Sequence, residues 1–100
     1  MSKDPVKLER EQAWVGDAVL GLYARSWLLR QGRFDALEYS EFTCNQSLAA
    51  LGSPTSIEAG IGRLYETEGL EAAFAWIEQH ILPLHEKRIA AKSRRQRRHR

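Results

Sequence analysis

The stretch from Trp14 to Leu20 is an apolar run with a single carboxylate, Asp17, near its centre. The apolar residues around it recur at intervals of three, four and seven, which is the spacing of one face of an α-helix. A lone charge buried on such a face costs several kcal/mol unless a cation or hydrogen-bond donors meet it. The sequence therefore predicts a long helix through this stretch and a specific partner for Asp17.

The rest of the chain is also predicted to be helical. No segment alternates between apolar and polar residues over a useful length, and Gly or Pro residues separate the periodic stretches. Helices are expected over residues 4–30, 35–51, 55–67 and 70–82, followed by a polar helical extension to about residue 91. The sequence thus predicts one small all-α domain, because 100 residues supply a single core.

The composition favours a cytoplasmic protein without a membrane segment. No run approaches the ~18–20 apolar residues that span a bilayer, and the first residues lack the apolar segment of a signal peptide. The chain has one cysteine, Cys44, which permits no internal disulfide and is expected to be buried. The histidines at 80, 85 and 99 form no cluster along the sequence and are expected to be exposed or to cap helix ends.

The charge is divided along the chain. Residues 1–85 carry 7 Lys and Arg against 12 Asp and Glu, a net charge of −5, whereas residues 86–100 carry 8 against one, a net charge of +7. We expect a helical domain over residues 1–91 and a disordered basic tail over 92–100 that contacts RNA phosphates. The residues predicted to bind RNA are Lys92, Arg94, Arg95, Arg97, Arg98 and Arg100. A solubilising or ribosome-anchoring tail is the alternative.

Four short motifs follow one another in the order seen in one enzyme family. They are Gly-Asp-Ala-Val-Leu at 16–20, Asn-x-x-Leu-Ala at 45–49, Glu-Ala-Gly-Ile-Gly at 58–62 and Gly-Leu-Glu-Ala at 69–72. In this order the chain resembles the catalytic domain of the ribonuclease III family, and most of all its short stand-alone Mini-III type. The resemblance implies a compact all-α homodimer, shortened here between Leu51 and Pro54, that cuts double-stranded RNA.

The resemblance also implies the chemistry and the residues that perform it. The cofactor would be Mg²⁺, or Mn²⁺ in its place, and Asp17 and Glu58 would be the metal-binding and catalytic residues. Other family carboxylates are replaced here by Arg10, Ala13 and Thr55. Small residues at 16, 18, 59 and 62 would let two helices pack closely and bring Asp17 and Glu58 together.

Each of these residues also has a simpler interpretation. Thr55 and Glu58 have the spacing of a helix capping box. Asp17 could be a structural carboxylate that accepts hydrogen bonds from backbone donors or pairs with an arginine such as Arg25 or Arg63. Trp14 occupies the place of an aromatic residue that contacts the partner subunit in the family, but it could equally be an ordinary core residue.

The leading hypothesis is a Mg²⁺-dependent endoribonuclease for double-stranded or structured RNA, with the family resemblance suggesting ribosomal RNA maturation. The competing hypothesis is a non-catalytic RNA-binding or ribosome-associated protein that keeps the fold, and the replacements at Arg10 and Ala13 favour it. A helical dimerisation module without an RNA role is a third interpretation, against which the basic tail argues.

Overall fold

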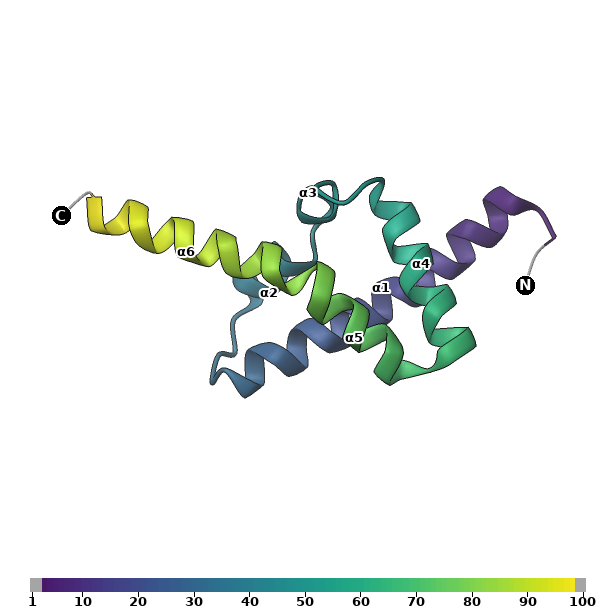
Figure 1. Ribbon diagram of the computed structural model, residues 1–100, viewed down its shortest axis with the longest axis horizontal. Helices are drawn as coiled ribbons and strands as arrows, with labels where there is room; N and C mark the ends of the chain where they lie inside the picture. The colour runs from purple at the N-terminus through teal and green to yellow at the C-terminus, as the bar shows by residue number, and fades with distance from the viewer. Residues whose placement is uncertain (1–2, 99–100) are drawn as a thin grey trace.

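The computed structural model describes residues 3–98, with side chains described to residue 95, and all regular structure in this part of the chain is helical. The helices are α1 (Pro5–Arg30), α2 (Ala36–Thr43), α3 (Asn45–Leu48), α4 (Pro54–Glu68), α5 (Leu70–His80) and α6 (Leu82–Arg98). Helices α4 and α5 pack across the long α1, and α6 extends away from them, so the molecule measures 57 × 25 × 21 Å (Figure 1). The prediction of an all-α fold is confirmed.

The first helix begins and ends close to where the sequence predicts. The Asp4 side chain accepts a hydrogen bond from the Val6 amide at 3.0 Å, and Pro5 occupies the first helical position, where its missing N–H costs nothing. The chain leaves α1 through Gly32, whose φ of +75° suits a residue without a Cβ. Local signals alone therefore define this 26-residue helix.

The predicted single helix over residues 35–51 is wrong, because the chain breaks at Cys44 into α2 and α3. Cys44 has an extended backbone, with φ −70° and ψ 157°. The Ser47 hydroxyl donates to the Glu41 carbonyl at 2.5 Å, and the Cys44 thiol points at the same oxygen. Such local side-chain bonds give the backbone an alternative to helical hydrogen bonding, which accounts for the break.

The last helix continues through most of the segment that the sequence assigns to a disordered tail. Helix α6 reaches Arg98, well beyond the expected limit near Ala91. Pro83 lies in its first turn, where proline is tolerated, and Lys, Arg and Gln are good helix formers. Adding residues to an existing helix is also far cheaper than starting one. Residues 99 and 100 lie outside the described part.

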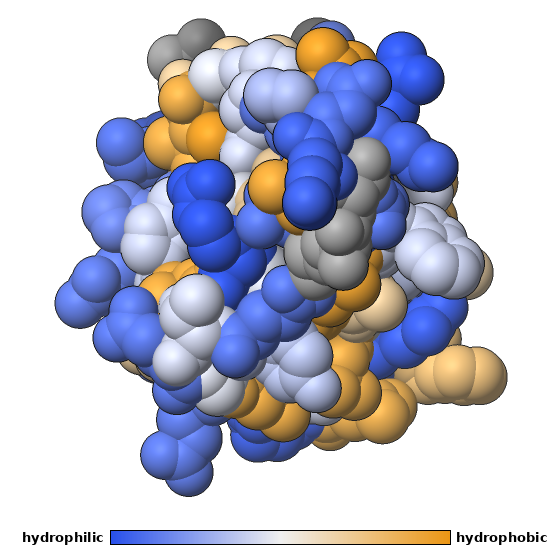
Figure 2. Space-filling view, turned by 90° about the vertical axis from the view of Figure 1, so that its right-hand side faces the viewer, coloured by the Kyte–Doolittle hydropathy of each residue, from blue (hydrophilic) through white to orange (hydrophobic). Residues whose placement is uncertain are grey.

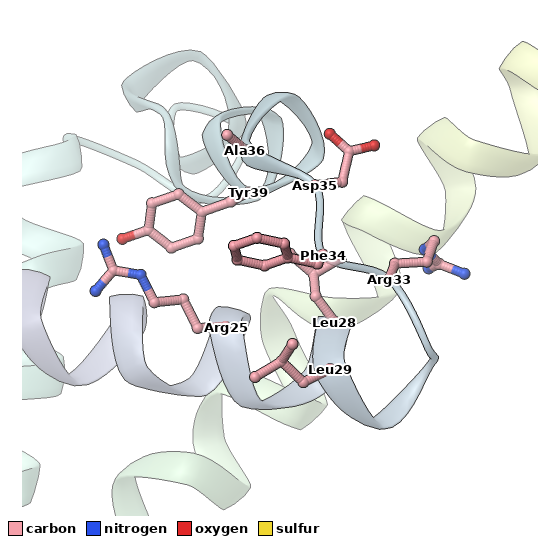
Figure 3. A pocket seen from close by; sticks show the side chains of 8 residues that line it. All are labelled: Arg25, Leu28, Leu29, Arg33, Phe34, Asp35, Ala36 and Tyr39. Carbon is pink, nitrogen blue, oxygen red and sulfur yellow. The ribbon is translucent and has the colours of Figure 1, made fainter.

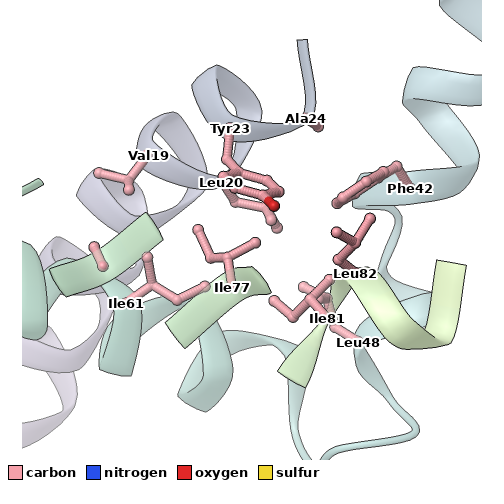
Figure 4. Close-up of a cluster of buried hydrophobic side chains, with 11 residues drawn as sticks. Val19, Leu20, Tyr23, Ala24, Phe42, Leu48, Ile61, Ile77, Ile81 and Leu82 are labelled. Atoms are coloured by element: carbon pink, nitrogen blue, oxygen red, sulfur yellow. The ribbon is translucent and has the colours of Figure 1, made fainter. Parts of the chain in front are cut away.

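The hydrophobic core joins α1 to the other helices (Figure 4). Leu20 and Tyr23 of α1 face Ile77 of α5 on one side and Phe42 of α2 on the other, and Ile81 closes the cluster from below. Burying one such side chain stabilises the fold by about 1.5–3 kcal/mol. The orientation of α1, and therefore of the residues on its remaining face, is set by this packing.

Candidate functional site

Helices α1 and α4 meet at a backbone-to-backbone contact made possible by two glycines. A Cβ atom on Gly16 would lie 2.6 Å from the carbonyl carbon of Glu58, and one on Gly62 would lie 2.9 Å from that of Gln12. Real Cβ atoms essentially never come this close to other atoms. Only residues without a side chain fit at these two positions, so Gly16 and Gly62 fix the register between the two helices.

The prediction that small residues make this contact is confirmed for Gly16 and Gly62. Ala59, the third of the four predicted positions, is buried. Ala18 is exposed instead and lies on the opposite, outward side of α1. Gly60 likewise faces open space, since a Cβ atom added there would have nothing within 4 Å.

This contact brings Asp17 and Glu58 together. Asp17 directly follows Gly16, which touches the backbone of Glu58, and the two carboxyl groups share a hydrogen bond. Burial raises the pKa of Glu58, and the hydrogen bond and the charge of Asp17 raise it further, to about 7. Two carboxylates can share a hydrogen bond only if one of them is protonated, so the pair holds a proton close to neutral pH.

The environment of Asp17 differs from the predicted one. The sequence places it on a buried surface, where it would need a cation or donors, but the side chain is exposed to solvent. Its partner is a second carboxyl group, that of Glu58. The pair is therefore accessible to a ligand from the solvent side, whereas Glu58 is half-buried behind it.

The arginine residues proposed as partners of Asp17 do not pair with it. Arg25 lies over the ring of Tyr39, 4.6 Å from its centre, beside a pocket of about 350 Å³ (Figure 3). Within residues 3–95, neither Arg25 nor Arg63 forms an ion pair with Asp17. The described residues thus provide no arginine partner for Asp17.

A capping box at Glu58 is also absent. The residue that caps α4 is Ser53, the helix begins at Pro54, and Thr55 lies inside the first turn. Thr55 is therefore too far along the helix to act as the N-cap that a Thr-x-x-Glu capping box requires. The interpretation of Thr55 and Glu58 as a capping box is therefore wrong.

An apolar hollow of about 530 Å³ adjoins Asp17. We call its apolar lining the Trp14 face, and it consists of Trp14, Val15, Ala18, Val19, Leu22, Tyr65 and Leu70. Trp14 is 82% exposed, so it is not a core residue of the single chain. Figure 2 shows that the end of the molecule seen there also carries apolar patches at its upper and lower edges, between strongly hydrophilic side chains.

The pair is a sparse set of metal ligands. In the described part of the chain, no group of three or more His, Cys, Asp or Glu side chains is placed to hold one ion. Mg²⁺ nevertheless binds through one or two carboxylates, with water and substrate oxygens completing its six ligands. A divalent cation would also relieve the repulsion that raises the pKa of Glu58. Asp17 and Glu58 therefore fit an ion that the protein coordinates only in part.

Sequence reasoning missed a buried polar cluster where α2 meets α6. His85 is 1% exposed and lies 2.9 Å from Glu38, to which Arg33 donates two hydrogen bonds, at 2.8 and 3.1 Å. Burial alone would raise the pKa of Glu38, but the hydrogen bonds from His85 and Arg33 outweigh it and lower the pKa.

A sequence signal for this cluster did exist. His85 continues the four-residue spacing of Ile77 and Ile81, which are both buried, so the expectation of an exposed or capping His85 is wrong. Its ring packs against those of Trp27 and Phe42. The periodicity of the buried residues of α5 thus reaches into α6.

The residues predicted to bind RNA lie along α6 as far as the structure describes them. Lys92 pairs with Glu41 at 2.6 Å, and Arg94 and Arg95 are exposed. The side chains of Arg97 and Arg98, and Arg100 as a whole, lie outside the described residues. The basic residues thus project from a helix and not from an extended tail.

Comparison of the chain with protein-family models, with curated proteins and with solved structures gives no match. Among the described helices, none combines the length and the apolar character needed to cross a membrane. Inference about function therefore rests on the chemistry of the residues described above.

Proposed function

We propose that the protein is a metal-dependent endoribonuclease that cleaves double-stranded or structured RNA, with Asp17 and Glu58 as its ion-binding pair. The observation that carries this proposal is the shared hydrogen bond between the two carboxyl groups at the glycine contact of α1 and α4. Groups with like charge repel, and residues with a shifted pKa such as Glu58 cluster at functional sites. The family resemblance supplies ribosomal RNA maturation as the process.

The two residues have different parts in this proposal. Asp17 is exposed and would meet the ion and the substrate phosphate, whereas Glu58 is half-buried and holds the shared proton. When bound, Mg²⁺ would supply an activated water and neutralise charge on the phosphate. Ion binding and protonation compete for the same oxygens, so we expect cleavage to weaken as the pH falls below about 7.

The Trp14 face supports a homodimer as the working form. It exposes Trp14, Leu22 and Tyr65 to solvent directly beside Asp17. Large exposed aromatic side chains next to a hollow are typical of interface anchors. A second copy that covers this face would place two carboxylate pairs in one particle, as cutting both strands of a duplex requires.

A non-catalytic RNA-binding or ribosome-associated protein is the competing proposal. Ala13 is buried and Arg10 is exposed one and two helical turns before Asp17, where the resembled family carries carboxylates. With two carboxylates among the described residues at this site, the protein could keep the fold and the basic helix while lacking cleavage.

Labelled duplex RNA distinguishes the two proposals. The enzyme proposal expects strand cleavage in Mg²⁺, none in EDTA, and a loss of roughly 100-fold or more for Asp17→Asn, since the substitution removes a charged ligand. Asp35→Asn is the matched control, because Asp35 caps α2 away from the site. RNA that is bound but never cut by the unmodified protein would establish the competing proposal instead.

A further inference from the structure

A cleft of about 570 Å³ lies between α6 and the α2–α3 junction. We call it the basic cleft, and its polar lining consists of Glu41, Cys44, Gln46, Ser47, Lys87, Arg88, Lys92 and Arg95. Four of these side chains are cationic, whereas Glu41 is the only acidic one. The cleft is separate from Asp17 and Glu58, neither of which lines it.

The floor of the cleft is held in place by hydrogen bonds between its two walls. Arg88 of α6 donates to the Glu41 carbonyl at 3.0 Å and to the Ser47 hydroxyl, and its Nε donates to the Leu84 carbonyl of its own helix at 3.3 Å. Lys92 closes the rim through Glu41. The shape of the cleft thus exists before any ligand arrives, which lowers the entropic cost of binding.

Positive charge in the cleft remains uncompensated. The carboxylate of Glu41 is already paired with Lys92, and among the described residues neither Lys87 nor Arg95 forms an ion pair. The Nη2 group of Arg88 is buried without a hydrogen-bond partner in that same part of the chain. That group is closed to solvent, so the cations that remain available to an anion in the cleft are Lys87 and Arg95.

The spacing of the free cations indicates which anion fits. Lys87 and Arg95 lie two turns apart on one face of α6, a separation of roughly 12 Å at ~1.5 Å per residue. Phosphates recur along one strand of double-stranded DNA at roughly 3.4 Å of helix axis, so a span of this order reaches more than one phosphate of a nucleic-acid backbone. A single small anion would leave one of the two cations without a partner.

We propose that the basic cleft binds the phosphate backbone of RNA, with Lys87 and Arg95 contacting separate phosphates and Arg88 positioning the cleft walls. The choice of RNA rests on the proposed function. The sequence placed the RNA contacts at the end of α6, and the cleft extends them back to the second turn of this helix. It also brings the RNA next to the α2–α3 junction, which contributes no basic residue to the lining.

Cys44 provides a chemical reporter at this site, because it is the only cysteine of the chain and lines the cleft. Burial alone would raise the pKa of its thiol, but hydrogen bonds from Ser47 and Gln46 and the charge of Arg88 lower it. Cys44 is also partly exposed, so the thiol should react with iodoacetamide, a neutral reagent, at mildly alkaline pH. Contact through the end of α6 alone would leave Cys44 open.

The first test measures the rate of Cys44 alkylation in EDTA, where no metal-dependent cleavage can occur. Saturating duplex RNA should slow it roughly fivefold or more, since thiol reactivity follows exposure. Inorganic phosphate and a polyglutamate peptide of equal total charge should not slow it. An alkylation rate that RNA does not change overturns the proposal. Equal protection by phosphate would show that the cleft binds a small anion, and equal protection by the peptide would show that it binds an acidic protein.

The second test measures RNA affinity against salt concentration and does not depend on Cys44. The double variant Lys87→Ala/Arg95→Ala should lower the slope of log affinity on log salt by about 1.8, at ~0.9 for each phosphate contact. Lys3→Ala/Lys7→Ala removes the same charge at the start of α1, which Figure 1 places at the opposite end of the molecule from the tip of α6, and should leave the slope unchanged. Equal slopes for the two double variants would overturn the proposal.

The two proposals fail in distinguishable ways. If RNA protects Cys44 but is never cut in Mg²⁺, the endoribonuclease proposal fails and the proposal that the cleft binds RNA stands. If RNA is cut while Cys44 stays fully reactive and the slope is unaltered, the cleft proposal fails alone. Absence of any RNA binding contradicts both.

Discussion

Asp17 and Glu58 share a hydrogen bond between two carboxyl groups that belong to different helices. The fold holds them together through Gly16 and Gly62, since no side chain separates the backbones of α1 and α4 there. Such a pair opposes folding whenever both groups are ionised, because like charges at hydrogen-bond distance repel. The pair therefore makes a measurable difference to the stability of the metal-free protein.

Glu58→Gln should stabilise the metal-free protein at high pH and not at low pH. The pKa of Glu58 is about 7 in the folded state against 4.5 ordinarily, so the native state loses stability as the pH rises from about 4.5 to 7. We expect a gain on the order of 1 kcal/mol at pH 8, or ~4–8 °C in Tm, after discounting for solvent screening, and no gain at pH 4. Calorimetry in EDTA measures both values.

Glu66→Gln is the matched control for that experiment, because Glu66 lies on the same helix and is exposed. It should produce no pH-dependent gain. Added Mg²⁺ should stabilise the unmodified protein more than the Glu58→Gln variant. A stability gain for Glu58→Gln that is the same at pH 4 and pH 8 would show that repulsion within the pair is not its cause.

Gly62→Ala should strongly destabilise the fold, whereas Gly60→Ala on the same helix should not. The new Cβ at position 62 would clash with the backbone of Gln12, and two packed helix backbones cannot easily move apart, so we expect a loss of roughly 3 kcal/mol or more. At position 60 nothing lies within 4 Å, and alanine should gain up to ~1 kcal/mol from helix propensity. Urea unfolding midpoints compare the two, and similar values would contradict the glycine contact.

His85→Ala should lower the free energy of unfolding by about 2–4 kcal/mol, because it empties a buried site and removes a hydrogen bond from Glu38. His80→Ala is the control. His80 is exposed and contacts only the ring of Trp76 among the aromatic residues described, so its loss should stay below ~1 kcal/mol. Equal effects of the two substitutions would contradict a structural role for the buried cluster.

Trp14→Ser should convert a dimer into a monomer if the Trp14 face joins two copies. The side chain is 82% exposed in the single chain, so the substitution removes interface area without emptying the core. Leu37→Ser changes an exposed apolar residue of α2 outside this face and should leave the dimer intact. Sedimentation velocity measures the masses, and an unmodified protein that remains monomeric at high concentration would contradict the interface.

Local sequence signals predicted the limits of α1 well, because Asp4, Pro5 and Gly32 act on their own neighbours. The break at Cys44 escaped prediction, since it depends on which carbonyl the Ser47 hydroxyl reaches in three dimensions. The continuation of α6 to Arg98 was not predicted, for another reason. A composition that cannot bury apolar surface was interpreted as disorder, although a helix that has already started needs no such burial to grow by a few turns.

The candidate site was predictable in part. The meeting of Asp17 and Glu58 could be anticipated from the small residues near each of them, because close helix packing requires such positions. The exposure of Asp17 could not be anticipated, because helical periodicity defines a face of the helix but does not show which other element covers that face. The basic cleft was equally beyond the sequence, because Glu41 and Ser47 are far from Arg88 along the chain and meet it only through the fold.

Helix α6 leads away from an acidic body and carries seven of the fifteen Lys and Arg residues of the chain, so the molecule has a permanent dipole moment along its length. In the field of a polyanion such a dipole experiences a torque before any contact forms. The protein should therefore arrive with α6 foremost and its acidic end turned away. Weakening this alignment with salt would slow the association rate even where the bound complex is unchanged.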